Sequence, residues 1–139
     1  MGVLSAFLHP EPMDITKEII ISDRFREDGK PVPFKIRTIS QAENDALVKK
    51  AQKVDMVRGR RIQYQDDQKY TNSLIVACTV QPDFRDAELC QAYGTLDPLE
   101  VPGKMLLSGE TAKLVEAIMN LNGFTIQPPE EEEEEAKNS

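Results

Sequence analysis

The spacing of hydrophobic residues changes along this chain, and each spacing predicts a different element. Leu4, Phe7 and Leu8 lie three and four positions apart, as on one turn of an amphipathic helix, and two prolines end that turn. Residues 17–25 and 31–39 instead alternate apolar and polar positions around an Asp-Gly turn signal, which predicts a β-hairpin. The chain is therefore expected to begin with a short helical arm and a hairpin.

Helical spacing returns after residue 39. Ser40 and Glu43 have the spacing of a capping box, in which each residue satisfies the backbone N–H of the other. The helix that they begin has an apolar stripe extending to Val54, and we expect a polar loop over residues 58–66.

The next helix is predicted to lie at the centre of the core. Asp66 or Asp67 serves as its N-cap, and Pro82 ends it. Its surface is apolar almost all round, which is typical of a buried helix. Leu74 is expected to be a core residue facing Ile118 of the last helix.

Three further helices are predicted before the chain becomes acidic. Asp86 caps the first, and Asp97 caps the second, which residues 102–103 interrupt with Pro-Gly. The third begins at Ser108 and ends at Gly123, where a Schellman motif is expected.

Together these elements predict an α+β fold that is mostly α. The N-terminal β-hairpin packs on a bundle of about four to five helices, and an acidic, disordered C-terminal tail follows. Residues 1–14 are expected to be an arm, residues 15–126 a single globular domain, and residues 127–139 the tail. The tail contains Glu130–Glu135, and such a charged run has nothing to bury.

The charge balance bears on the class of partner. The net charge is −7, and the six consecutive glutamates account for all but −1 of it. Nucleic acids and anionic membranes are therefore not expected as partners, and no apolar run is long enough to span a bilayer. The basic cluster at residues 58–61 admits three interpretations: a solvated loop, a site for phosphate or an acidic partner, or pairing with the acidic tail of the protein itself.

No residue pattern indicates catalysis, a cofactor or a metal. Cys78 and Cys90 lie on apolar helical faces and are expected to be reduced and packed, and there is one histidine. Asp83, Asp86 and Glu88 are better explained by capping a helix than by acid–base chemistry. The chain is therefore not expected to be an enzyme.

The candidate partner-binding residues are Leu4, Phe7 and Leu8. Two interpretations of this helical turn remain open from the sequence. It is either a docking element on a proline-containing linker, or a turn that folds back on the hairpin of the same chain.

A family resemblance spans residues 4–124. It rests on several segments that occur in register: LSAFL, KEIIISDRF, PVPFKIRTISQAENDAL, KYTNSLIVACTVQPDFRDAELCQAYG, LDPLEVPGKMLLSGE and the closing NGF. In this order they resemble the XkdN-like tail assembly chaperones of contractile-tailed phages and PBSX-like prophages. The chain departs from the resemblance at Pro102-Gly103, where a smoother helix is implied.

The resemblance implies a protein of viral assembly. Such a chaperone binds the long helical tape measure protein, keeps it soluble and is displaced as the tail tube polymerises. The tail tube protein and further copies of the chain are additional implied partners. The implied location is the cytoplasm of the bacterial host, and absence from the mature virion is expected. The alternative is a structural virion component, such as a tail completion or adaptor protein.

Overall fold

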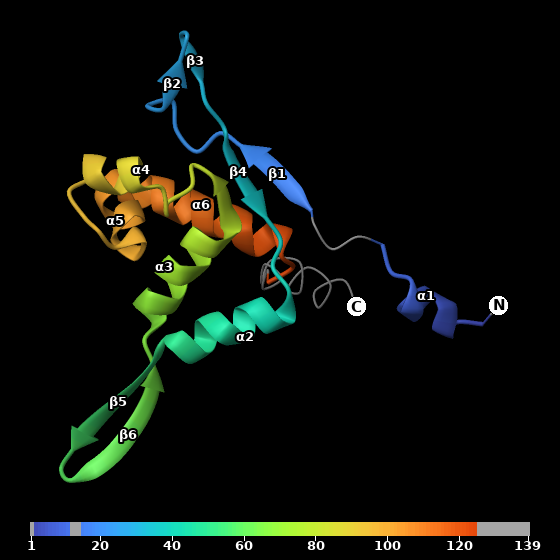
Figure 1. Ribbon diagram of the computed structural model, residues 1–139, viewed down its shortest axis with the longest axis vertical. Helices are drawn as coiled ribbons and strands as arrows, with labels where there is room; N and C mark the ends of the chain where they lie inside the picture. The colour runs from blue at the N-terminus through green and yellow to red at the C-terminus, as the bar shows by residue number, and fades with distance from the viewer. Residues whose placement is uncertain (1, 12–14, 125–139) are drawn as a thin grey trace, which may run out of the picture.

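The computed structural model describes residues 2–11 and 15–124 (Figure 1). In chain order the elements are α1 (Leu4–Leu8), β1 (Thr16–Ile19), β2 (Arg26–Glu27), β3 (Lys30–Pro31), β4 (Phe34–Arg37), α2 (Gln41–Lys50), β5 (Gln52–Val57), β6 (Arg60–Gln65), α3 (Asp67–Cys78), β7 (Thr79–Gln81), α4 (Ala87–Ala92), the 3-10 helix η1 (Pro98–Glu100), α5 (Val101–Met105) and α6 (Ser108–Leu121).

A three-stranded antiparallel sheet supports the body of the protein. Its middle strand, β4, pairs with β1 on one edge and with β7 on the other. Phe34 lies opposite Ile19, and Ile36 lies opposite Thr79. Phe34 and Ile36 are both buried, whereas the residues between and after them are half-buried, as expected for a strand with one face on the core.

The core lies between this sheet and the helices, and α3 is its central element. α3 packs against α2, α5, α6, η1 and β7. Leu74 on α3 and Ile118 on α6 have exposed fractions of 2% and 0%. The prediction that the helix after Asp66 is central, with Leu74 and Ile118 in the core, is therefore confirmed.

Several predicted helix boundaries are also confirmed. Ser40 and Glu43 form the capping box of α2, and the Asp66 carboxylate accepts the backbone N–H of Lys69 at the start of α3. At the end of α6, Gly123 has a φ of 74°, and the N–H of Phe124 donates to the carbonyl of Met119. This is the 6→1 bond of a Schellman motif.

The predicted fold class is wrong because strands were missed. In the described part of the chain helices hold 46% and strands 22% of the residues, and the strands form three small sheets rather than one hairpin on a helical bundle. The expected N-terminal hairpin is present as the β1–β4 pair. However, the long connection between these strands contains a second, two-residue ladder, β2–β3, around Asp28-Gly29.

The largest correction concerns residues 52–65. The pattern predicted a helix extending to Val54 and then a polar loop, but α2 ends at Lys50 and a hairpin of β5 and β6 follows. Arg58 and Gly59 have φ angles of 52° and 76° and form its two-residue turn. Ala51, the C-cap of α2, lies between the helix and the hairpin and is fully buried.

Two smaller corrections concern the C-terminal half. Residues 79–81, assigned from the pattern to the end of the central helix, are the edge strand β7. Pro102 and Gly103 were expected to interrupt a helix, but both lie inside α5, with Pro102 in its first turn. Proline is tolerated there because the N–H that it lacks has no partner inside the helix. The predicted disordered tail lies outside the described residues.

Candidate partner-binding surfaces

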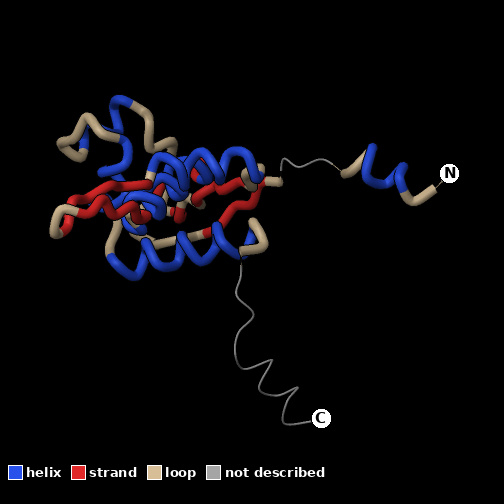
Figure 2. The backbone as a smooth tube through the Cα atoms, turned by 90° about the horizontal axis from the view of Figure 1, so that it is seen from below, coloured by secondary structure: helices blue, strands red, loops and turns tan. Residues whose placement is uncertain are grey.

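The helix α1 displays all three predicted partner-binding residues. Leu4, Phe7 and Leu8 are 67%, 75% and 63% exposed, and no residue of α1 is buried. Figure 2 shows α1 standing apart from the body of the protein. The structure thus brings the three side chains together on one exposed turn and does not fold that turn back on β1 and β4.

A helix of this length has little stability of its own. It has five residues and no side-chain cap, whereas an isolated helix needs roughly 12–15 residues even to be marginal in water. Exposed apolar residues on so short a helix gain free energy only when another surface covers them. α1 therefore presents an exposed apolar surface on a helix with little stability of its own.

The β5–β6 hairpin is a second exposed surface, which the sequence analysis did not identify. All twelve of its residues are exposed, and they include five large apolar side chains: Val54, Met56, Val57, Ile62 and Tyr64. Figure 1 shows the hairpin projecting from the junction of α2 and α3. Among the described strands, β5 and β6 pair only with each other, in a two-stranded sheet.

A signal for this hairpin is present in the sequence. Val54 and Met56 alternate with Lys53 and Asp55, which is the two-residue period of a strand. Val54, however, also fits the helical stripe of α2, seven positions after Leu47. The helical interpretation of that one residue concealed the strand.

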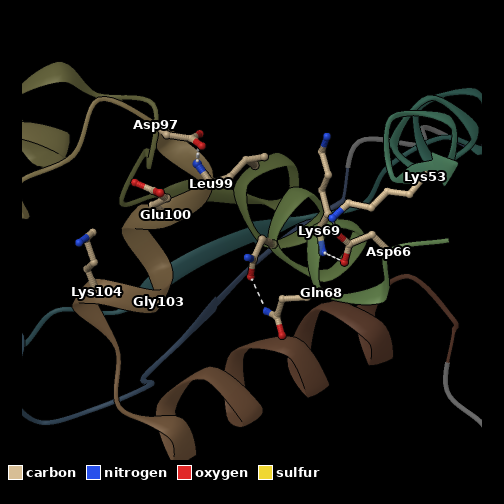
Figure 3. A pocket seen from close by; sticks show the side chains of 10 residues that line it. Lys53, Asp66, Gln68, Lys69, Asp97, Leu99, Glu100, Gly103 and Lys104 are labelled. Atoms are coloured by element: carbon tan, nitrogen blue, oxygen red, sulfur yellow. Dashed lines mark hydrogen bonds and ion pairs between the residues drawn. The ribbon is translucent and has the colours of Figure 1, made fainter. Parts of the chain in front are cut away.

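A cleft of about 670 Å³ lies at the base of the hairpin (Figure 3). It is bounded by Lys53 of β5, by the first turns of α3, and by η1 and α5. Three basic and three acidic side chains line it: Lys53, Lys69, Lys104, Asp66, Asp97 and Glu100.

Most polar groups of this cleft are engaged in maintaining the structure. The Lys53 ammonium pairs with the Asp66 carboxylate at 2.8 Å, which raises the pKa of Lys53 and lowers that of Asp66. Asp97 caps η1 by accepting the N–H of Leu99, and the Thr95 hydroxyl donates to Glu100. The cleft is therefore suited to contact with a polar surface, and its ion pair fixes the hairpin to α3.

The acidic cluster near residue 86 has the structural role expected from the sequence. Asp86 caps α4 by accepting the N–H of Leu89, and Asp83 accepts the N–H of Arg85. Cys78 and Cys90 are both buried and free, as predicted. Burial raises the pKa of the Cys78 thiol to about 11.

One ion pair anchors the long β1–β4 connection to α6. Arg24 donates two hydrogen bonds to the Glu110 carboxylate, at 2.9 and 2.5 Å, and a third to the carbonyl of Met105. The guanidinium also lies 4.9 Å from the centre of the Phe25 ring. Arg24 and the N–H of Leu107 hold the pKa of Glu110 well below its usual range, at about 2.

The described residues contain neither a metal-binding cluster nor a membrane-spanning helix. Among residues 2–11 and 15–124, no group of three or more histidine, cysteine, aspartate or glutamate side chains is arranged to hold a metal ion. In the same part of the chain, no helix has the length and apolar character needed to cross a bilayer.

Sequence comparisons connect the chain to phage proteins. The sequence pattern of the phage XkdN-like tail assembly chaperone proteins matches residues 4–137. The chain is 36% identical over 124 residues to the phage-like element PBSX protein XkdN of Bacillus subtilis strain 168, covering 87% of this chain and 83% of that protein. It is 35% identical over 139 residues to YqbN of the same organism, covering 97% and 93% respectively.

The fold is shared as well. The crystal structure of YqbN superposes with a TM-score of 0.72 at 31% sequence identity, covering 86% of this chain and 96% of that one. The family pattern begins at Leu4, so it includes α1 along with the body. The chain therefore belongs to the phage XkdN-like tail assembly chaperone family.

Proposed function

We propose that this tail assembly protein binds the tape measure protein, keeps it soluble and is displaced when tail tube subunits polymerise. The observation that carries the proposal is α1, whose three apolar side chains are exposed on a helix too short to be stable alone. The family supplies the assembly role, and α1 supplies a surface suited to an apolar partner.

The chemistry of a tape measure suits such a surface. A long helical rod presents apolar stripes that aggregate unless another protein covers them. An amphipathic turn covers part of a stripe by packing its apolar side against it. Many copies along one rod bind with high combined affinity although each contact is weak, and weak contacts allow the tail tube protein to displace them.

We further propose that residues 1–14 act as a binding arm and residues 15–126 as the body. In this proposal the body acts by binding, without catalysis. The protein acts in the cytoplasm of the bacterial host and does not remain in the finished particle. A structural virion component would instead copurify with particles. Immunoblots of lysate and of purified particles separate the two functions, and signal in particles at a stoichiometry comparable to the tube protein contradicts the proposal.

The test of the binding proposal is co-expression with the tape measure protein. The full chain is expected to raise the soluble fraction of the tape measure and to copurify with it. Phe7→Ala is expected to weaken both effects, because it removes the largest apolar side chain of α1, while the melting temperature stays nearly constant.

Leu96→Ala is the matched control. Leu96 is 92% exposed and lies in the loop after α4, so its loss removes a similar apolar area away from α1. If the full chain leaves the tape measure insoluble and does not copurify, the proposed function is wrong. If Leu96→Ala reduces binding as much as Phe7→Ala, α1 is not the binding element.

A further inference from the structure

The tip of the β5–β6 hairpin gathers three arginines. Arg58 is in the two-residue turn, and Arg60 and Arg61 are the first residues of β6. Successive residues of a strand point to opposite faces, so Arg60 and Arg61 lie on opposite sides of the hairpin. Positive charge therefore surrounds the tip instead of lying on one face.

The described part of the chain provides no anionic partner for these arginines. Within residues 2–11 and 15–124, no hydrogen bond or ion pair engages the side chain of Arg58, Arg60 or Arg61. Lys53, at the base of the same hairpin, is by contrast paired with Asp66. A guanidinium presents a fork of donors that matches a carboxylate, so carboxylates are the natural partners of the tip.

The chain itself contains the complementary segment. Glu130–Glu135 supplies six of the 24 acidic residues and nearly all of the net charge of −7. These residues lie outside the described part of the chain, and their charge follows from the sequence alone. Six consecutive glutamates present carboxylates in several directions whatever their backbone conformation, which suits a tip that is positive on both faces.

The glutamates that meet the tip could belong to the same copy or to a second copy. The reach of the segment bears on that choice. The Asn122 side chain, at the end of α6, accepts the N–H of Ile39 just before α2, so the end of α6 lies beside the start of α2. From there the chain passes along ten residues of α2 and six of β5 before Arg58, a path of roughly 35 Å. Figure 1 shows α2 leading away from the end of α6, with the hairpin beyond it.

The same chain's glutamates reach that far only when the chain between them and α6 is strongly stretched, since a flexible segment of eleven residues spans about 18 Å on average. Glu130 is six residues after Phe124 and Glu135 is eleven, so the two lie at most about 20 and 40 Å from the end of α6. Such stretching is entropically costly, and it favours contact of the tip with the last glutamates of the segment. The acidic segment of a neighbouring copy is attached to a different body, so this length of chain does not limit its approach to the tip.

We infer that the arginine tip of one copy binds the Glu130–Glu135 segment of a second copy. Each copy has one tip and one acidic segment, so the contact is head-to-tail and leaves a free tip and a free segment at the two ends of every open assembly. Contacts of this heterologous kind build open chains when the rotation does not close a ring. The inference concerns copy-to-copy contact and is independent of what α1 binds.

Salt dependence gives the first test. The net charge of −7 makes copies repel one another, and screening weakens that repulsion, so nonspecific association would increase with salt. A tip–segment contact behaves in the opposite way. In sedimentation equilibrium, we expect the average mass to rise with protein concentration at about 0.01 M salt and to return to that of one chain at about 1 M, where the Debye length is about 3 Å.

A complementary pair of variants gives the decisive test. The first carries Arg60→Glu and Arg61→Glu, and the second carries glutamine at each of the six positions Glu130 to Glu135. Each alone is expected to have the mass of one chain at low salt. An equimolar mixture is expected to form a two-chain complex and nothing larger, because the intact tip of one variant meets the intact segment of the other.

The matched control for the tip variant is Lys17→Glu with Lys113→Glu, which makes the same change in charge at exposed positions of β1 and α6. It should still associate. Circular dichroism checks that each variant folds. If the tip variant does not fold, a synthetic peptide of residues 130–139 added to the glutamine variant should shift the NMR signals of the hairpin.

Three results would overturn the inference. The first is a full chain whose mass does not depend on concentration at low salt. The second is a mixture of the two variants that remains as single chains. The third is a dilute glutamine variant whose hairpin NMR signals differ from those of the full chain, because the contact would then be within one copy.

Discussion

α3 and the β5–β6 hairpin adjoin in the chain but differ in their relation to the core. α3 has five buried residues and packs against helices and a strand around it, whereas every residue of β5 and β6 is exposed. Both contain large apolar side chains. Apolar content alone therefore does not determine which of these two elements is buried. The hairpin stays exposed although a packed helix follows it closely in the chain. Substitutions in the two regions should therefore have unequal effects.

The largest effect is expected from Leu74→Ala on α3. The side chain is 2% exposed, so truncation removes buried apolar surface and leaves a cavity among packed neighbours. The free energy of unfolding should fall by about 2–5 kcal/mol. Urea denaturation followed by circular dichroism measures it, and a loss below about 0.5 kcal/mol, as at a surface site, would contradict the central position of α3.

An intermediate effect is expected from acid, through Glu110. Its pKa is lowered from 4.5 to about 2, so the ion pair with Arg24 contributes to stability above pH 4.5 and this contribution is lost as the pH falls toward 2. Glu110→Gln should lower the melting temperature at pH 7, and the difference from the unmodified chain should shrink toward pH 2.

The control for Glu110→Gln is the same substitution at Glu116, an exposed residue of the same helix. It should leave the melting temperature nearly constant at both pH values. A difference between Glu110→Gln and the unmodified chain that is equally large at pH 7 and pH 2 would show that packing of the side chain, rather than its charge, stabilises this region.

The smallest effect on stability is expected from Met56→Ala in the hairpin. Met56 is 68% exposed, so its truncation should change the free energy of unfolding by no more than about 0.5 kcal/mol. Urea denaturation under the conditions used for Leu74→Ala allows a direct comparison. A loss near that of Leu74→Ala would mean that the hairpin is packed against the body in solution, and the contrast between the two regions would be lost.

The elements that could be predicted from the sequence are those whose boundaries depend on local signals. α2, α3 and α6 begin or end at residues whose side chains act locally: Ser40 with Glu43, Asp66, and Gly123 with Phe124. Such signals depend only on near neighbours in the chain. The core positions Leu74 and Ile118 followed from helical spacing for the same reason.

The missed elements depend on partners that are distant or on weaker turn signals. β7 follows directly from α3 and becomes a strand by pairing with β4, more than forty residues earlier. The hairpin turns at Arg58-Gly59, and an arginine with positive φ is a less common turn residue than asparagine or aspartate. The apolar spacing of α1 is visible in the sequence, but no local pattern shows whether another surface covers it.

The two buried thiols have a practical consequence for studying the hairpin. Both cysteines of the sequence lie in the core, and the raised pKa of Cys78 keeps its thiol protonated at neutral pH. Alkylating reagents attack thiolates that they can reach, so the folded chain should remain largely unlabelled. A single Gln63→Cys substitution on β6 would then accept a fluorophore or spin label selectively. Motion and proximity of the hairpin could be followed spectroscopically without first removing the native cysteines.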